Sequence, residues 1–183
     1  MSFKAEYIEA GIRHFGGVQS LDFTAASGAR GNTKVDLDVV KKHPLFMRLI
    51  NRELARLAGP YHPDLIVPIP TGADIFGIEV ARRLETGCAL LEWEDKTPGQ
   101  KTLRPRTEKD LAMIVEASRI VFVDDVFSTD SSIQAVHDMP DISFKAEGAV
   151  VIWDRSDGSF ADKMPIPVDS IVHSYVPFLA GVK

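Results

Sequence analysis

Two adjacent carboxylates followed by a hydroxyl-rich loop stand out in the stretch VFVDDVFSTDSS, residues 121–132. Asp124 and Asp125 can accept hydrogen bonds from a diol or hold a hydrated magnesium ion. The start of a helix, which we expect directly afterwards, is a ready site for an anion. The side chains available there as donors are the hydroxyls of Ser128, Thr129, Ser131 and Ser132.

A structural interpretation of the same loop stands beside this functional one. Asp130 or Ser131 would cap the helix, and the hydroxyl groups would only satisfy nearby backbone groups. Clusters of Ser, Thr and Asp are common before helices. The residue types of this loop therefore leave both interpretations open.

The elements that position this loop follow from hydrophobic periodicity. Helical patterns at residues 3–15 and 44–57 open the chain, and short apolar runs at 65–69, 88–91, 120–123 and 149–153 come next, with helical patterns at 75–84 and 131–139 between them. Continuous apolar runs between helices are typical of strands buried on both faces of a parallel sheet. The fold class is therefore α/β, with a doubly wound, mainly parallel sheet flanked by helices.

Three polar loops fall at the carboxyl ends of these predicted strands: 70–74, 124–132 and 154–158. Ligands of open parallel sheets bind at this edge. We therefore expect the three loops to converge on one crevice.

Composition limits the protein class. The chain has 183 residues and is 45% hydrophobic, which suits one core, so we expect a single domain over residues 1–183. The net charge of -5 argues against general affinity for nucleic acid or for an anionic membrane. Cys88 is the one cysteine, so no intrachain disulfide forms and a cytoplasmic protein is expected. No apolar run reaches the roughly 18 residues of a membrane span.

Four segments resemble type I phosphoribosyltransferases, and most closely the orotate phosphoribosyltransferases. VFVDDVFSTDSS resembles the phosphoribosyl diphosphate signature of that family. SGARGNTKVDLD (27–38) resembles its S-G-x-x-S-x-x-Y-x-D segment, PIPTGADIFGIEVA (68–81) its diphosphate loop and following helix, and VVIWDRSDGS (150–159) its D-R-x-E-G segment. All four occur in family order.

The resemblance implies a transferase and assigns a role to each segment. The reaction would move phosphoribosyl from phosphoribosyl diphosphate to a pyrimidine base, in the orotate case giving orotidine 5'-monophosphate and diphosphate with Mg²⁺. Asp124 and Asp125 would meet the ribose hydroxyls, and Arg155 would take the orotate carboxylate. The diphosphate would be wrapped by Thr71, Gly72, Ala73 and Asp74, and the 5'-phosphate by Ser128, Thr129, Asp130, Ser131 and Ser132.

Two questions stay open at this point: which groups would hold Mg²⁺, and whether Arg155 binds the base. The resemblance implies no dedicated metal ligand: Mg²⁺ would be held through the substrate, with Asp124 and Asp125 as the candidate protein contacts. The alternative for Arg155 is a surface ion pair with Asp154 or Asp157.

The resemblance also organises the rest of the chain. Residues 1–40 would form a small N-terminal hood, and residues 92–110 a flexible loop that closes over the site. Lys96 would reach the diphosphate leaving group and stabilise its developing charge. In the family this loop often acts across a dimer, which implies a homodimer.

Several positions depart from the family pattern. Asp130 stands where the family has glycine, Glu92 and Trp93 replace a basic pair, and Pro98 replaces a histidine. A second function class therefore stays open: a non-catalytic relative that binds a nucleotide or phosphoribosyl diphosphate as a regulator. A transferase for another base is a third alternative.

Overall fold

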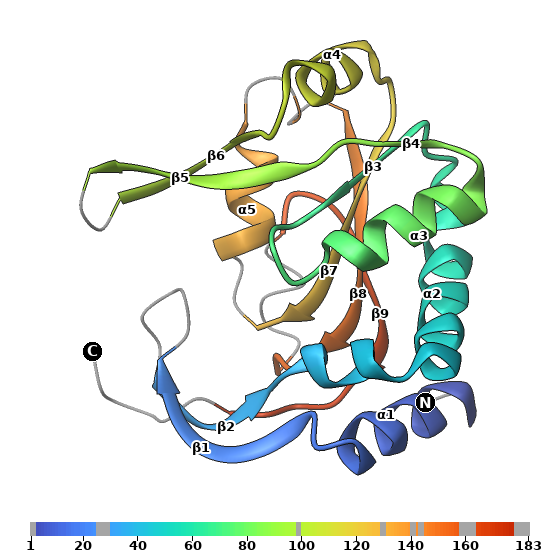
Figure 1. The fold of residues 1–183 in the computed structure, drawn as a ribbon, viewed down its shortest axis with the longest axis vertical. Coiled ribbons are helices and arrows are strands. Elements are labelled where there is room, and N and C mark those ends of the chain that lie inside the picture. The colour runs from blue at the N-terminus through green and yellow to red at the C-terminus, as the bar shows by residue number, and fades with distance from the viewer. Residues whose placement is uncertain are drawn as a thin grey trace.

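The structure is a computed structural model that describes residues 3–24, 30–97, 100–128, 131–139, 142, 145–157 and 164–177. Its centre is a five-stranded sheet in the order β4-β3-β7-β8-β9, in which every neighbouring pair is parallel. Two antiparallel hairpins, β1-β2 and β5-β6, extend from the body of the molecule (Figure 1).

The described elements have the following bounds: α1 Phe3–His14, β1 Val18–Thr24, β2 Arg30–Val35, η1 Leu37–Lys42, α2 Pro44–Ala58, η2 Gly59–Tyr61, β3 Leu65–Pro68, α3 Asp74–Leu84, β4 Gly87–Cys88, β5 Leu91–Thr97, β6 Gln100–Pro105, α4 Glu108–Glu116, β7 Ile120–Phe127, α5 Ser131–His137, β8 Ala146–Asp154 and β9 Val168–His173.

Helices cover both faces of the central sheet, which confirms the predicted fold class. Alternate residues of one strand point to opposite faces, so Val121 packs in the core beneath α1, α2 and α3, whereas Phe122 packs in the core formed with α4 and α5. In Figure 1, α2 and α3 lie on one side of the sheet and α5 on the other. The strands are apolar on successive residues because both of their faces are buried.

The N-terminal elements α1, β1 and β2 lie next to the carboxyl ends of the strands (Figure 1). The α1 helix packs on α2, where Gly11 lies directly against the Phe46 ring. The buried Glu53 carboxylate of α2 accepts a hydrogen bond from Lys4 Nζ of α1 at 3.1 Å, and it accepts another from Arg56 Nε at 2.8 Å. These contacts hold α1 against the body of the protein.

The segment 92–110 differs from the predicted loop. Most of it forms the β5-β6 hairpin, with Glu92 opposite Arg104, and α4 begins at Glu108. Arg104 forms an ion pair with Glu92 at 2.7 Å across the strands. Polar residues on both faces hide the period-2 pattern of a strand, but the Pro98-Gly99 dipeptide is a turn signal that predicts such a hairpin.

Several strands of the central sheet also differ from the sequence prediction. The β9 strand, Val168–His173, was not predicted, because Asp169 and His173 interrupt its apolar pattern. The β7 strand continues to Phe127, so Asp124 and Asp125 lie within it and not after it. The predicted run 88–91 is split, since β4 ends at Cys88 and Leu91 begins β5.

In the described part of the chain, no helix combines the length and apolar character needed to cross a membrane.

Candidate functional site

The loop that follows β3 is joined to the edge of the sheet by a backbone hydrogen bond and by close packing of α3. Ile69 N donates to Val123 O of β7 at 2.8 Å, which extends the ladder one residue beyond the strand. At Gly77 a Cβ would lie 2.6 Å from Pro68 Cβ, so glycine lets α3 approach the end of β3. The loop 70–74, with its cis Pro70–Thr71 peptide bond, thus runs from the end of β3 into the first turn of α3.

The acid pair lies at the centre of this edge, on β7. Asp124 is buried, and burial together with the neighbouring charge of Asp125 raises the pKa of Asp124 well above its ordinary value. Burial also raises the pKa of Asp125, although a backbone hydrogen bond from Val126 N opposes that shift. Two carboxylates held in a poorly solvated position are costly to ionise, so the pair suits a ligand with hydroxyl donors or a cation.

The acid pair and the loop after β3 meet at Gly72. A Cβ at this position would lie 2.8 Å from the carboxyl carbon of Asp125, which is closer than real side chains pack. Glycine is therefore the residue that lets the loop backbone reach the carboxylate. This close approach joins two segments that are about fifty residues apart in the sequence.

The hydroxyl-rich loop after β7 is described in part. Ser128 and Ser132 are half-buried, and α5 begins at Ser131. Thr129, Asp130 and the Ser131 side chain lie outside the described residues. Their predicted contacts to a 5'-phosphate, and the capping alternative for Asp130, stay predictions.

The base of the β5-β6 hairpin contacts the loop after β3 through two side chains. Neither contact was predicted from the sequence. Trp93 Nε1 donates to Pro70 O at 3.0 Å, and Arg106 Nη2 donates to Asp74 Oδ2 at 2.6 Å. Asp74 therefore meets a cation in the protein itself. A tryptophan in a polar segment was the available signal for the first contact, and nothing in the sequence pairs Arg106 with Asp74.

Lys96 lies on β5, in this hairpin. Its side chain is outside the described residues, so its predicted reach to the leaving group stays a prediction.

Arg155 lies just beyond the end of β8, beside β7, but its side chain is buried and not on the surface. It is 3% exposed, and its guanidinium donates to Val176 O at 2.9 and 3.1 Å. The alternative of a surface position is therefore wrong. The guanidinium carbon lies 5.4 Å from the ring centroid of Phe23 on β1, which places Arg155 between the sheet and the hood. Its predicted contact with a carboxylate of the base stays a prediction.

Among the described residues, no three His, Cys, Asp or Glu side chains gather as a metal site.

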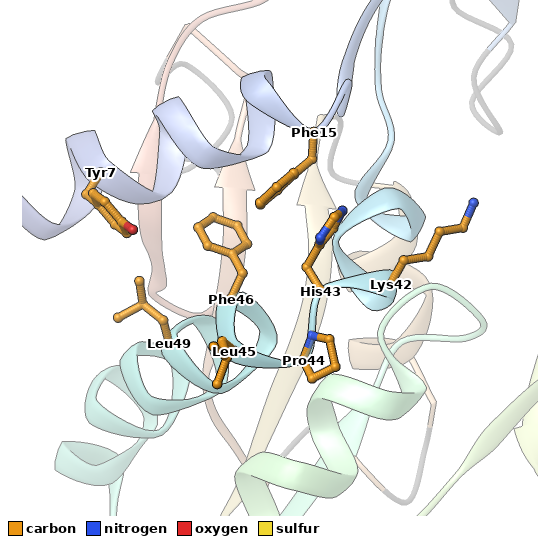
Figure 2. A pocket seen from close by; sticks show the side chains of 8 residues that line it. All are labelled: Tyr7, Phe15, Lys42, His43, Pro44, Leu45, Phe46 and Leu49. Atoms are coloured by element: carbon orange, nitrogen blue, oxygen red, sulfur yellow. The ribbon is translucent and has the colours of Figure 1, made fainter.

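A hollow of about 370 Å³ lies elsewhere, in the seam between α1 and the start of α2 (Figure 2). Phe15 stacks on His43 there, with ring centroids 3.7 Å apart, and Phe46 packs edge-on against Phe15. None of its lining residues belongs to the predicted site. The hollow therefore lies between α1 and the start of α2, apart from the loops of the predicted site.

Comparison with known proteins gives related sequences over most of the chain. It is 28% identical over 151 residues to the orotate phosphoribosyltransferase of Caldanaerobacter subterraneus subsp. tengcongensis, covering 82% of this chain and 74% of that protein. It is 24% identical over 153 residues to the adenine phosphoribosyltransferase of Gluconobacter oxydans, covering 78% of this chain and 85% of that protein.

Solved structures share the fold at lower identity. Orotate phosphoribosyltransferase from Aeropyrum pernix superposes with a TM-score of 0.70 at 20% identity, covering 91% of this chain and 93% of that one. Leishmania donovani UMP synthase superposes with a TM-score of 0.69 at 21% identity, and there this chain covers 36% of the longer chain.

The profile of the phosphoribosyl transferase domain matches residues 36–182. This match takes in the loop after β3, the acid pair and the sheet that joins them. The chain therefore belongs to the phosphoribosyl transferase domain family.

Proposed function

We propose that this protein transfers phosphoribosyl from phosphoribosyl diphosphate to a pyrimidine base, with orotate as the first candidate. The observation that carries the proposal is the close approach of Gly72 to the Asp125 carboxylate. It brings the proposed diphosphate loop to the group proposed to bind the ribose. The orotate phosphoribosyltransferase among its relatives supports the choice of base.

In the proposed reaction, the bond between ribose C1' and the diphosphate oxygen breaks, and diphosphate leaves with the electron pair. A ring nitrogen of the base forms the new bond to C1', and the proton that this nitrogen carried passes to solvent. Asp124 and Asp125 would hold the ribose hydroxyls and favour the positive charge that grows on the sugar ring. Backbone N–H groups of residues 71–74, near the start of α3, would bind the diphosphate.

The acid pair also fits a hydrated Mg²⁺ ion. Asp124 and Asp125 repel one another in a buried position, and a nearby divalent cation would relieve that repulsion. Carboxylate oxygens and substrate phosphates are the ligands that Mg²⁺ prefers. When bound, the ion would neutralise charge on the diphosphate.

Asp130 is the residue that argues for a non-catalytic binder. A carboxylate about 4 Å from a phosphate costs ~1 kcal/mol in a water-like medium and ~4 kcal/mol at an effective dielectric of ~20. These costs correspond to roughly a five-fold to a thousand-fold loss of affinity. A relative that acts on adenine supports a second candidate reaction, with a purine as acceptor.

The test is calorimetry with phosphoribosyl diphosphate and Mg²⁺, followed by separate orotate-consumption and adenine-consumption assays. Both are run on the wild type and on Asp130→Gly. We expect binding by both proteins and faster turnover in the variant. If both proteins release heat on binding but neither turns over, the protein is a non-catalytic binder. If both proteins show no heat and no turnover, the proposal is refuted. Consumption of adenine without consumption of orotate would show that the acceptor is a purine and not a pyrimidine.

We further propose that the protein acts in the cytoplasm as a homodimer. Its single cysteine supports the compartment, and the family resemblance supports the dimer. Light scattering coupled to size-exclusion chromatography tests the oligomeric state, and a monomer at assay concentrations would contradict it.

A further inference from the structure

Lys41 lies at the edge of the proposed site, on the short 3-10 helix η1. Its Nζ is 5.8 Å from the ring centroid of Phe76, which is in the first turn of α3, directly after the proposed diphosphate loop. The positive charge of Lys41 also acts on the acid pair, since it opposes the rise that burial causes in the pKa of Asp125. Lys41 therefore lies beside the start of α3 and close enough to Asp125 for its charge to act there, whereas the charge of Asp38 acts on Asp125 with the opposite sign.

The geometry of η1 explains which of its side chains lie beside Lys41. Residues three apart share a face of a 3-10 helix. Leu37 and Val40 are buried and hold one face of η1 against the core, so Asp38 and Lys41 share the adjacent face. The Asp36 side chain accepts a hydrogen bond from Asp38 N at 3.0 Å and caps the helix start.

The proposed diphosphate loop needs a cation from outside itself. Residues 70–74 contain no basic side chain and one acidic one, Asp74, whose carboxylate forms an ion pair with Arg106. A diphosphate group carries several negative charges, and backbone N–H groups alone neutralise only part of them. A lysine beside the loop supplies a full positive charge.

We propose that Lys41 binds the diphosphate group of phosphoribosyl diphosphate. This inference rests on the proposed function and adds a binding residue that lies about thirty positions before the loop.

Lys41 forms an ion pair with Asp38, and a ligand can replace Asp38 in that pair. Its Nζ is 2.6 Å from Asp38 Oδ1, and the Asp38 side chain is 73% exposed while that of Lys41 is 26% exposed. Ion pairs with such an exposed member contribute little. A diphosphate oxygen would therefore displace the Asp38 carboxylate, and Asp38 competes with the ligand for Lys41.

The neighbouring Lys42 provides a matched control. It is exposed, belongs to the same helix and carries the same charge. It lines the hollow between α1 and α2, where it extends away from the rings of Phe15 and Phe46 (Figure 2). Replacing Lys42 removes the same net charge from the protein without removing the cation whose charge acts on Asp125.

The experiment is calorimetric titration with inorganic diphosphate and Mg²⁺, and then with phosphoribosyl diphosphate. The proteins are the wild type, Lys41→Met, Lys41→Arg, Lys42→Met and Asp38→Asn. We expect Lys41→Met to weaken diphosphate binding about ten- to 100-fold, as the loss of a charge-assisted hydrogen bond does. Lys41→Arg should retain most of the affinity, Lys42→Met should match the wild type, and the KM for the base should not change.

Asp38→Asn gives an independent test of opposite sign, which does not depend on the folding of Lys41→Met. Removing the competing carboxylate should tighten diphosphate binding. If the wild type binds phosphoribosyl diphosphate while neither Lys41→Met nor Asp38→Asn alters diphosphate affinity, the inference on Lys41 fails and the proposed function stands. If the wild type binds neither ligand, both fail.

Discussion

The contact between the loop after β3 and the acid pair is tested most directly by Gly72→Ala. The new Cβ would overlap Asp125 Oδ2 and lie 2.8 Å from the carboxyl carbon of that residue, whereas ordinary packing needs at least 3.4 Å. The loop must therefore shift, or the Asp125 carboxylate must rotate away from it. Strain of this kind costs about 1–3 kcal/mol. Because the displaced groups are those proposed to bind the sugar and the diphosphate, affinity should fall about five- to 150-fold.

The assay is calorimetry with phosphoribosyl diphosphate and Mg²⁺, together with steady-state kinetics of base consumption. Gly59→Ala is the matched control, because Gly59 has helical backbone angles and the nearest atom to its Cβ is 3.9 Å away. The control should behave as the wild type in both measurements. A Gly72→Ala protein with unchanged melting temperature, unchanged affinity and unchanged kcat/KM would refute the reasoning.

Three further substitutions test individual groups. Trp93→Phe removes the hydrogen bond to Pro70 O, worth about 0.5–1.5 kcal/mol, so the KM for phosphoribosyl diphosphate should rise about two- to twelve-fold; an unchanged KM would contradict this. Asp124→Asn should lower turnover about ten- to 100-fold, yet stabilise the ligand-free protein at pH 7. Burial raises the pKa of Asp124 in the folded state, so the charged form of Asp124 opposes folding. In urea unfolding, the extra stability of Asp124→Asn should therefore vanish below pH 3.8. A variant less stable than the wild type at pH 7 would contradict this expectation. Glu53→Gln should destabilise the protein by about 1–3 kcal/mol at pH 7. Burial raises the pKa of Glu53, but the hydrogen bonds that Arg56 and Lys4 donate to its carboxylate lower the pKa by more, so it lies below 4.5. The carboxylate therefore stabilises the fold above pH 4.5 and loses this effect as pH falls through its folded pKa, so a difference between the two proteins that stays constant down to pH 3 would exclude this role.

The elements with strong periodic patterns were predictable from the sequence. The α2 helix was expected at 44–57 and spans Pro44–Ala58, because Pro44 begins it and its apolar residues recur at helical spacing. The buried strands β3 and β8 were also predicted, since both of their faces are covered and their apolar runs are uninterrupted. The β5-β6 hairpin was missed because it forms a separate two-stranded sheet with polar residues on both sides.

The sequence by itself determined which residue types the site has: two carboxylates directly after a buried apolar run, a loop that contains Gly72, and a hydroxyl-rich loop. That both carboxylates belong to the strand itself was decided by the structure. Their meeting at one edge follows from the parallel order of the sheet, which the alternation of strands and helices already indicated. What only the tertiary structure decided is which distant side chains contact these loops. Trp93 reaches Pro70, Arg106 reaches Asp74, Arg155 is buried against Val176 O, and Lys41 lies near the Phe76 ring at the start of α3. Such contacts depend on how hairpins and hood elements pack on the sheet, and packing geometry leaves no periodic signal in the chain.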